Sequence, residues 1–435
     1  MSSPPSTPLF PPGEYDARVT RVRERMLQAD LDALLVSSPE NIYYLCGLDH
    51  MGYFAYQMLI VPADGPLTLV TRAMERATVR DQVPDITHVG YADGGPAVPP
   101  SEAPAQEVVM AATSDDGRAD GLRPWEMSVG LPARSPGETP APSAQVAATV
   151  DALENAGLTR GRLGLEKGSS FLPFGTAEAL TAAVPAARWE DASGMVDDCR
   201  IVQSPRELVR TRQAAVVSDA MMWSAIAAAG PGVATHDVMA AVYDTMFRRG
   251  GTYPGFVPLV RSTRTLDHEH GTWQAGRLRK GDLLFLEMAG CVRRYHAPLG
   301  RLVFIGRIPA RAARMQRICH DAMMRAADVM RPDVEAGTVY QRWHAALDEA
   351  GLHTFTRHHC GYAVGIGYPP SWSGSGVPVG LRPGSTMRLR AGMVFHLMSW
   401  LLRTGKGDFF LSDTALVTAH GGELLTTVNR DVVVR

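Results

Sequence analysis

The sequence of 435 residues lacks long apolar runs and has no excess of either charge. It contains no uncharged apolar stretch of about 18 residues, the length that a transmembrane helix requires, so we predict no membrane span. Lys and Arg number 43 against 45 for Asp and Glu, a net charge of −2. Proteins that bind nucleic acid or anionic membrane surfaces typically carry a basic excess. We therefore expect neither partner, and small molecules or proteins stay open as partners.

Paired cysteines are also absent. The five cysteines form no Cys-x-x-Cys pair; they are Cys46, Cys199, Cys291, Cys319 and Cys360. An odd, scattered set of this kind is typical of reduced thiols in a cytoplasmic protein. Residues 1–13 are rich in Pro and Ser and lack the basic segment and apolar core of a secretory signal. We expect a cytoplasmic protein with a short disordered lead-in.

The length predicts two domains, because a single hydrophobic core stops growing well below 435 residues. Residues 14–194 alternate helix and strand signals, beginning with an amphipathic helix over residues 15–29, and indicate an α/β domain. Within it, residues 94–143 are rich in Pro, Gly, Ala, Ser and Glu, and we expect a flexible excursion there. The second domain, residues 195–435, opens with a helix whose start is marked by Ser204, Pro205 and Glu207, a capping box.

Four segments of the second domain carry a family pattern. In chain order they read DLLFLEMAG with RYHAPLGR (282–301), GYAVG (361–365), GMVFHLM (392–398) and LSDTALVT (411–418). They resemble the metal-binding hairpin, the G-H-G-[IV]-G segment and the final two strands of methionine aminopeptidases and prolidases. The chain is thereby identified as a member of the creatinase/prolidase family. The resemblance implies a creatinase-like N-terminal α/β domain followed by a pita-bread domain of the α+β class.

The positions that bind two divalent metals in those peptidases carry other residues here. The family uses two Asp, one His and two Glu; the resemblance places at these positions Glu287, Pro298, Tyr362, Met398 and Ser412. A pair of hard cations requires several anionic oxygen or imidazole ligands. Only Glu287 keeps a carboxylate, so we predict that the protein binds no metal and needs no cofactor.

Two metal-free groups of the family, creatinase and ectoine hydrolase, provide a closer comparison. EMAGCVRRYHAPLGR (287–301) and GYAVGIGYPPSW (361–372) are similar to the ectoine hydrolase patterns E-x-A-G-C-x-x-R-Y-H-x-P-L-x-R and G-Y-x-I-G-x-x-Y-P-P-D-W. The resemblance implies a metal-independent hydrolase of a C–N bond in a small amidine or guanidino acid. The sequence departs from that pattern by the basic residues Arg261, Arg264, Arg403 and Lys406, so it does not identify the substrate.

Glu287 is the candidate nucleophile or base. It follows an apolar strand, where a carboxylate is costly unless it meets a cation, and an amidinium is such a cation. The alternative is a structural Glu287 paired with Arg294 or Arg301. His270 lies close to the place where the family carries a histidine, and the resemblance implies a general acid/base there. His268 is a rival, since it would share the same face of a strand.

Further candidates for substrate binding are aromatic or histidine side chains in the same segments: Tyr295, His296, Tyr362, Tyr368, Trp372 and His396. Tyr295 and His296 alternate along a strand, so we expect one to face the site and the other the core. The rigid turn from Tyr368 to Trp372 suits contact with a small cation. Core packing is the alternative for each aromatic residue.

In creatinase-type dimers the N-terminal domain of one subunit covers the site of the other. The run from Tyr53 to Tyr56 occupies the corresponding position, so the resemblance implies a homodimer in which Tyr53 or Tyr56 lies near the partner's site. Three other functions stay open at this point. They are a lyase similar to family members that cleave dimethylsulfoniopropionate, a biosynthetic or non-catalytic member with altered substrate, and a divergent metallopeptidase.

Overall fold

The computed structural model describes residues 9–91, 143–374, 376, 378–402 and 408–435. The chain forms two compact units, Met1–Arg200 and Ile201–Arg435. The boundary that we predicted, between residues 194 and 195, lies before helix α6 (Asp197–Arg200), which belongs to the first unit. Most of the expected lead-in and excursion, together with Arg403 and Lys406, lies outside the described residues.

The first unit contains a six-stranded sheet in the order β4-β3-β2-β1-β5-β6. Its strands are β1 (Ala33–Val36), β2 (Met58–Pro62), β3 (Thr68–Arg72), β4 (Thr87–Tyr91), β5 (Arg162–Leu165) and β6 (Arg188–Asp191). Its other helices are α1 (Pro12–Gln28), α2 (Pro39–Cys46), η1 (Met51–Phe54), η2 (Ala73–Glu75), α3 (Arg76–Gln82), α4 (Ser143–Asn155) and α5 (Phe174–Ala183). β2 pairs antiparallel with both neighbours, and the remaining pairs are parallel.

The start of α1 corrects one expectation. The helix begins at Pro12, so residues 12 and 13 are not part of a disordered lead-in. A proline at the first helical position loses no hydrogen bond and has the helical φ, which makes it a favourable start. Phe10 is buried, and its ring lies 4.6 Å from the guanidinium carbon of the buried Arg18. The chain is therefore packed from at least Phe10 onward.

The second unit is built on an eight-stranded sheet. Its main order is β10-β11-β12-β9-β8-β7, with β13 paired to β12 and β14 to β9. The strands are β7 (Leu259–Ser262), β8 (Leu283–Val292), β9 (Tyr295–Phe304), β10 (Gly361–Ala363), β11 (Val394–Leu401), β12 (Phe409–Thr418), β13 (Gly421–Leu424) and β14 (Val433–Val434). The helices are α7 (Pro205–Ala228), α8 (Thr235–Arg248), η3 (Thr263–Thr265), α9 (Ala312–Asp328) and α10 (Ala336–Glu349).

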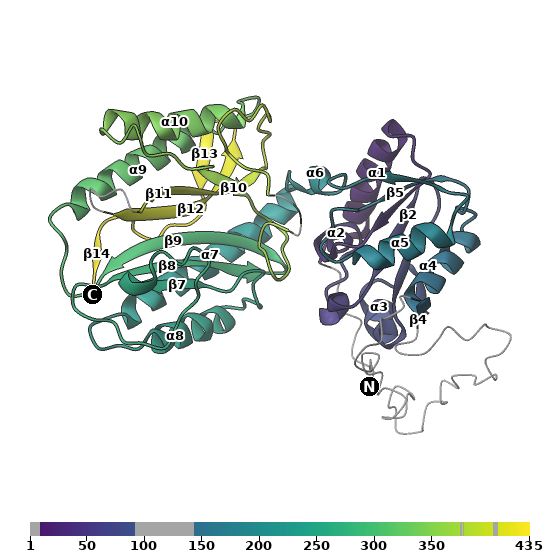
Figure 1. The fold of residues 1–435 in the computed structure, drawn as a ribbon, viewed down its shortest axis with the longest axis horizontal. Coiled ribbons are helices and arrows are strands. Elements are labelled where there is room, and N and C mark those ends of the chain that lie inside the picture. The colour runs from purple at the N-terminus through teal and green to yellow at the C-terminus, as the bar shows by residue number, and fades with distance from the viewer. Residues whose placement is uncertain (1–8, 92–142, 375, 377, 403–407) are drawn as a thin grey trace, which may run out of the picture. The chain divides into compact units, whose positions relative to one another are not determined.

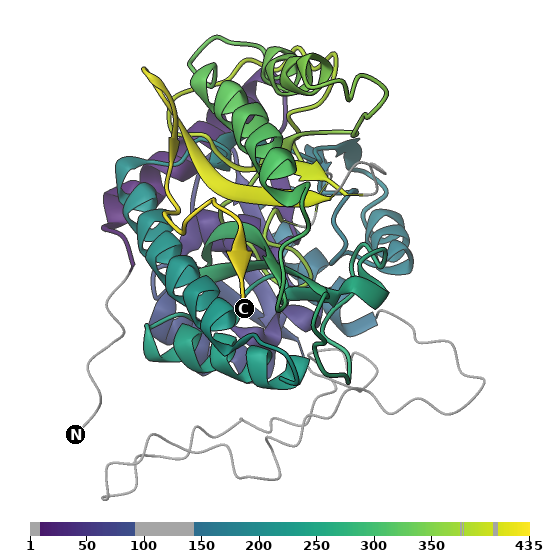
Figure 2. The same cartoon turned by 90° about the vertical axis from the view of Figure 1, so that its left-hand side faces the viewer.

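Helices cover one face of this sheet. α7 and α8 lie along the half formed by β7, β8 and β9, and α9 and α10 along the half with β11 and β12 (Figure 1). In the turned view, the green helix α9 crosses the yellow strands of its half (Figure 2). Leu284 and Leu286 pack with α7 and α8, and Ser399 Oγ accepts a hydrogen bond from Trp343 Nε1 of α10. The side chains that alternate with these on the strands therefore project from the opposite face.

Local sequence explains how the elements that carry this face begin and turn. The predicted capping box at the start of α7 is present: Ser204 accepts from the Glu207 N–H, and the Glu207 side chain accepts from the Ser204 N–H. β8 and β9 are joined by Arg293 and Arg294, both with positive φ (50° and 67°), as in the mirror-image turns of two-residue hairpins. Among the described residues, no helix is long and apolar enough to cross a membrane.

Candidate active site

Glu287 lies in the middle of β8, on the face that the helices leave uncovered. Strand pairing places Leu259, Glu287 and Gly300 side by side on β7, β8 and β9. Gly300 pairs with Ser412 of β12, and Ser412 with Met398 of β11. Directly paired residues project to the same side of a sheet. These five residues form one row across the sheet, here called the Glu287 row.

Two further rows flank the Glu287 row on the same face, because every second residue of a strand projects to one side. The row on one side carries polar groups from β10, β11 and β12: Tyr362, His396 and Thr414. The row on the other side carries an arginine and three aromatic rings: Arg261, Phe285, Phe410 and Trp400. A polar edge and a cationic, aromatic edge therefore border the carboxylate.

The face is concave. β9 and β12 lie between β8 and β11, yet Glu287 Oε1 is 3.7 Å from His396 Nδ1. Arg261 extends from β7 until its guanidinium carbon is 5.2 Å from the centre of the Trp400 ring on β11. Side chains from distant strands meet in this way only when the sheet curls around them. The curvature collects the three rows into one site.

The five positions at which the resemblance expected metal ligands all lie on this face. Glu287, Met398 and Ser412 belong to the Glu287 row, and Tyr362 and Pro298 project beside it. The thioether, the pyrrolidine ring and the two hydroxyl groups are poor ligands for hard divalent cations. In the part of the chain that the structure describes, no group of three or more His, Cys, Asp or Glu residues could hold a metal ion. These side chains do not fit the dinuclear centre of the family.

The Glu287 carboxylate is buried, with 3% of its surface exposed, and accepts no hydrogen bond from a described residue. Its pKa is raised to about 7: burial is the largest cause and Glu269 adds to the rise, whereas the cations Arg261 and Arg357 oppose it. A substantial fraction of Glu287 is therefore protonated at neutral pH.

The structural alternative for Glu287 required an ion pair with Arg294 or Arg301. Arg301 belongs to the opposite face, where its guanidinium forms an ion pair of 2.9 Å with Asp413. Arg294 lies over the rings of Tyr253 and Tyr368, at 3.8 and 4.8 Å. Neither arginine pairs with Glu287. The carboxylate consequently meets no strong protein cation at hydrogen-bonding distance among the described residues.

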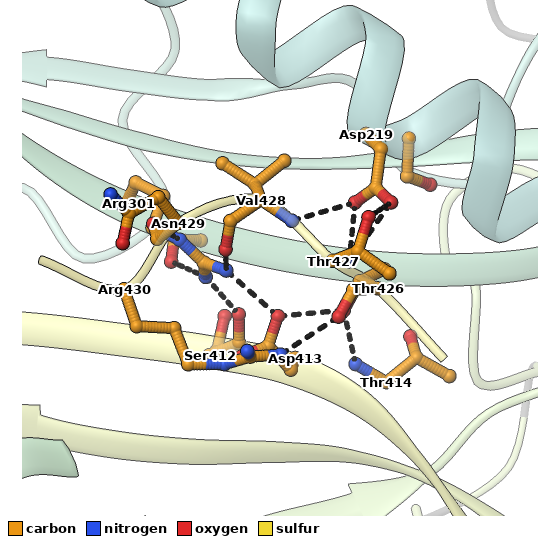
Figure 3. A network of polar contacts seen from close by, with 12 residues as sticks. Asp219, Arg301, Ser412, Asp413, Thr414, Thr426, Thr427, Val428, Asn429 and Arg430 are labelled. Carbon is orange, nitrogen blue, oxygen red and sulfur yellow. Dashed lines mark hydrogen bonds and ion pairs between the residues drawn. The ribbon is translucent and has the colours of Figure 1, made fainter. Parts of the chain in front are cut away.

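The Arg301–Asp413 pair forms part of a buried polar network behind the site (Figure 3). Arg301 also donates to the Ser412 and Val428 carbonyls, while Asp413 accepts a second ion pair from Arg430 at 2.7 Å. Strand alternation explains why Asp413 projects here and its neighbour Ser412 projects into the site. The network fixes the backbone of β12 directly behind Ser412.

Four side chains form a hydrogen-bonded chain at the polar edge of the site. Trp372 Nε1 donates to the Tyr362 hydroxyl at 2.9 Å, which lies 3.1 Å from His396 Nδ1, and His396 Nε2 lies 2.7 Å from Ser412 Oγ. Burial lowers the pKa of His396 to about 3, so the ring is neutral and carries one N–H. These four side chains together carry four N–H or O–H protons, and three hydrogen bonds join them. In either tautomer of His396, one hydroxyl proton, on Tyr362 or Ser412, is left to donate to a substrate.

We expected His270 on a strand, but the structure places it outside the strands. β7 ends at Ser262, where reciprocal hydrogen bonds with Thr265 start the η3 turn, and His268 and His270 follow on an exposed turn. The Arg261 guanidinium donates to the carbonyl of His268 at 3.0 Å and so holds this turn beside the site. The His270 ring lies 6.1 Å from Phe256, which packs 5.0 Å from Trp372. His270 is therefore at the rim of the site.

Three of the predicted substrate contacts are brought together, and three are used by the protein itself. Tyr362, Trp372 and His396 meet in the chain just described. Tyr295 projects to the helix-covered face and donates to Glu207 Oε1 at 2.9 Å. His296 faces the site side, but its Nε2 accepts from the Gly255 N–H at 2.8 Å and its Nδ1 lies 3.2 Å from the Gly365 carbonyl. Tyr368 is buried beneath Arg294.

Tyr53 and Tyr56 pack inside the first unit. Tyr53 is buried edge-to-face against Phe171, with ring centres 5.7 Å apart. The Tyr56 hydroxyl is 2.9 Å from Thr149 Oγ1. Phe54, between them, is 60% exposed. Within this aromatic run, Phe54 rather than either tyrosine presents its ring to the surroundings of the unit.

Sequence reasoning missed several side chains of the site. Phe256 and Trp400 had no family motif to mark them, and Ser412 was considered only as a weak metal ligand. Arg357 was missed as well, although it lies five positions before Tyr362 and could have been noted as a basic residue beside a site motif. Arg261 was recognised only as a departure from the family pattern. Its position on β7, paired with Phe285, gives it a place in the site.

Comparison with known proteins agrees with this architecture. Residues 209–419 match the model of metallopeptidase family M24, and residues 18–202 match that of the creatinase/prolidase N-terminal domain. The Xaa-Pro dipeptidase from Bacillus anthracis superposes with a TM-score of 0.75 over 97% of this chain and 100% of the other, at 17% identity. The prolidase from Pyrococcus horikoshii gives 0.73 over 96% and 100%, at 19% identity. The predicted fold, a creatinase-like α/β domain and a pita-bread domain, is confirmed.

Relatives with similar sequence extend along the whole chain. An uncharacterised hydrolase/peptidase of Sinorhizobium fredii, y4tM, is 28% identical over 440 residues and is covered to 98%, as is this chain. The ectoine hydrolase of Halomonas elongata is 25% identical over 432 residues, with 97% of each chain covered. The Xaa-Pro dipeptidase of Pyrococcus horikoshii is 24% identical over 62% of this chain and 74% of its own. The relatives thus include both non-peptide and peptide hydrolases by name.

Proposed function

Because this chain belongs to the creatinase/prolidase family, with its N-terminal domain and its M24 hydrolase domain, we propose that it is a metal-independent hydrolase of a C–N bond in a small amidine or guanidino acid. The observation that carries the proposal is Glu287, a buried carboxylate in the place of a metal centre, with no hydrogen-bond donor from the described residues. An ectoine hydrolase similar over 97% of the chain supports the substrate class.

Glu287 acts on the carbon between the two nitrogens of the substrate. An amidinium or guanidinium supplies a cation with N–H donors to the carboxylate, which accepts no hydrogen bond from the described residues. Binding of this cation favours the ionised carboxylate, whose pKa burial has raised to about 7. In one route a carboxylate oxygen bonds to this carbon from above the plane of the cation, the C–N bond breaks as its nitrogen is protonated, and water then hydrolyses the acyl adduct. In the other route the carboxylate takes a proton from a water that adds to the carbon, and the C–N bond breaks as its nitrogen is protonated.

His270 supplies the proton to the departing nitrogen. His396 is nearer to Glu287, but both of its nitrogens are bonded to Tyr362 and Ser412, and its pKa of about 3 makes it a poor proton donor at neutral pH. His270 lies on the exposed turn at the rim, where its imidazole is open to solvent and its ring centre is 6.1 Å from that of Phe256. His396 and Tyr362 position the substrate.

The working form is a cytoplasmic homodimer in which the N-terminal domain of one subunit covers the site of the other. All five cysteines are free thiols, which agrees with a reducing compartment. Tyr53 and Tyr56 are packed within their own domain, so the exposed Phe54 of the same run is the side chain offered to the partner. Light scattering of the wild type and of Phe54→Ala tests this: a fully active monomer contradicts it.

Turnover of ectoine, creatine and other amidine acids by protein dialysed against a chelator tests the proposed reaction. We expect hydrolysis without added metal and less than 1% of it in Glu287→Gln. Thermal unfolding of that variant should match the wild type near pH 4, where the acid is protonated in the folded and the unfolded protein. Xaa-Pro dipeptides serve as the competing substrates. Stoichiometric bound metal together with dipeptide cleavage would overturn the proposal.

A further inference from the structure

Arg357 is a cation at the aromatic edge of the site. Its guanidinium carbon lies 4.6 Å from the centre of the Trp400 ring, and the guanidinium of Arg261 lies 5.2 Å from the same ring. Phe285, which precedes Glu287 by two residues on the same face, packs 5.3 Å from Trp400. Two guanidinium groups therefore meet at one indole next to the Glu287 row.

The two arginines differ in how they are held. Arg261 is 1% exposed, and its Nη1 donates to the carbonyls of Leu266 and His268, at 3.1 and 3.0 Å. The Arg357 guanidinium forms no ion pair or hydrogen bond with any described side chain, and it is half-buried. Hydrogen bonds therefore hold Arg261 in place, whereas the N–H donors of the Arg357 guanidinium are available to a ligand.

Partial burial of the Arg357 charge costs free energy, and no hydrogen bond from a described residue offsets this cost. Burial disfavours its charge and lowers its pKa, while Glu269 and Glu287 stabilise the charge from beyond ion-pair distance. Contact with Trp400 provides a cation–π attraction, which orients the guanidinium plane without using its N–H groups. An oriented, partly desolvated guanidinium with unused donors is suited to bidentate binding of a carboxylate.

We propose that Arg357, oriented on Trp400, binds the carboxylate of the substrate while Glu287 binds its amidinium or guanidinium end. This inference rests on the proposed function and adds a residue that determines specificity. The two ends of the site carry opposite charges, so they select a zwitterion and its orientation. A basic amidine without a carboxylate contacts Glu287 but leaves Arg357 without an anion. A dipeptide has no planar cation for Glu287.

Three ligands test the inference with the full-length protein. Ectoine carries both charges, its decarboxylated analogue 2-methyl-1,4,5,6-tetrahydropyrimidine carries only the amidinium, and propionate carries only the carboxylate. Because the wild type is expected to hydrolyse amidines, calorimetry follows the heat of turnover of the first two and yields KM as the measure of their binding, or the dissociation constant where no turnover occurs. Propionate binding is measured by saturation-transfer NMR. The variants are Arg357→Met, which keeps an apolar stem on Trp400, and Arg342→Met, an exposed arginine of α10, as the matched control.

We expect Arg357→Met to weaken ectoine binding by about 10- to 100-fold, the range of a charge-assisted pair, and to leave binding of the decarboxylated analogue unchanged. The propionate signal is lost in Arg357→Met and kept in Arg342→Met and in Glu287→Gln. If neither amidine binds the wild type but propionate still depends on Arg357, the proposed function fails and the carboxylate site stands. Equal binding of ectoine or propionate to the wild type and Arg357→Met overturns the inference, as does a wild type that binds no carboxylate.

Discussion

The Glu287 carboxylate and the His396 imidazole meet at 3.7 Å although two strands separate β8 from β11. Burial raises the pKa of Glu287 and lowers the pKa of His396, and in both groups it favours the neutral form. The centre of the site is consequently a low-charge environment, and a charged substrate brings the ionic interactions with it. The predictions below follow from this relationship.

Glu287 should lower the stability of the protein as the pH rises. Its folded pKa of about 7 lies above the ordinary value of 4.5, so the unfolded chain loses its proton first, and stability falls between about pH 4.5 and 7. Glu287→Gln removes this effect. We expect equal stabilities near pH 4.5 and an advantage of the variant approaching about 3 kcal/mol above pH 7. Denaturant unfolding at both ends of this range measures the difference, and a constant difference would contradict it.

The same ionisation should govern catalysis. Only the ionised Glu287 serves as nucleophile or base, so kcat/KM of the free enzyme should rise with pH through about 7 and level off above it. Below the midpoint the rate should fall about tenfold per pH unit. A pH profile that is flat between pH 5.5 and 8 would remove Glu287 from both roles.

Substitution of His268 and of His270, one at a time, should separate the roles of these two histidines at the rim. His270→Gln should reduce kcat by roughly 100- to 1,000-fold, the usual contribution of a general acid, with little change in KM. His268→Gln is the matched control and should stay within a few-fold of the wild type. Both residues are exposed, so the free energy of unfolding should change by less than about 0.5 kcal/mol. The reverse ranking of the two variants would assign the proton transfer to His268.

Tyr362→Phe should break the hydrogen-bonded chain in its middle. The change leaves the Trp372 N–H and His396 Nδ1 without their shared partner, at a cost of about 1–3 kcal/mol in stability. KM should rise because His396 loses its orientation. Tyr243→Phe on α8 removes the hydroxyl of a half-buried tyrosine outside the site and should be silent. Equal effects of the two variants would show that the chain does not position the site.

The Arg301–Asp413 pair should contribute to stability and not to chemistry, since it lies on the face opposite Glu287. Arg301→Met leaves a buried carboxylate with one ion pair fewer and should cost about 3 kcal/mol or more. kcat of the folded fraction should stay unchanged. Arg325→Met, which breaks the exposed ion pairs of Arg325 with Asp321 and Glu349, should have no measurable effect on unfolding.

The family motifs predicted part of the site. Glu287, Tyr362, Met398 and Ser412 come from four separate segments, and strand pairing brings them into neighbouring rows, as the family resemblance implied. The motifs were informative because alternate residues of a β-strand project to the same face, so the spacing within a motif indicates which of its side chains share a face. The partners of Glu287 were beyond this reasoning, because they depend on how far the sheet curls.

The sequence predicted least where the chain leaves regular structure. His270 was expected on a strand, but the side chains of Ser262 and Thr265 end β7 early and turn the chain. Tyr295 and His296 were correctly expected to alternate, yet Glu207 and the Gly255 N–H take up their polar atoms. The Arg357–Trp400 contact joins a loop to a strand, with no periodic signal that could reveal it.

Gly300 lies where the Glu287 row meets the aromatic edge of the site. A methyl group here would collide with the Phe410 ring and lie 2.7 Å from Ser412 Oγ. Any side chain at position 300 would therefore have to displace the Phe410 ring or the Ser412 hydroxyl. The close approach of β9 and β12 in the middle of the Glu287 row thus leaves room for glycine alone, and Gly300→Ala should disturb the site through packing without removing any polar group.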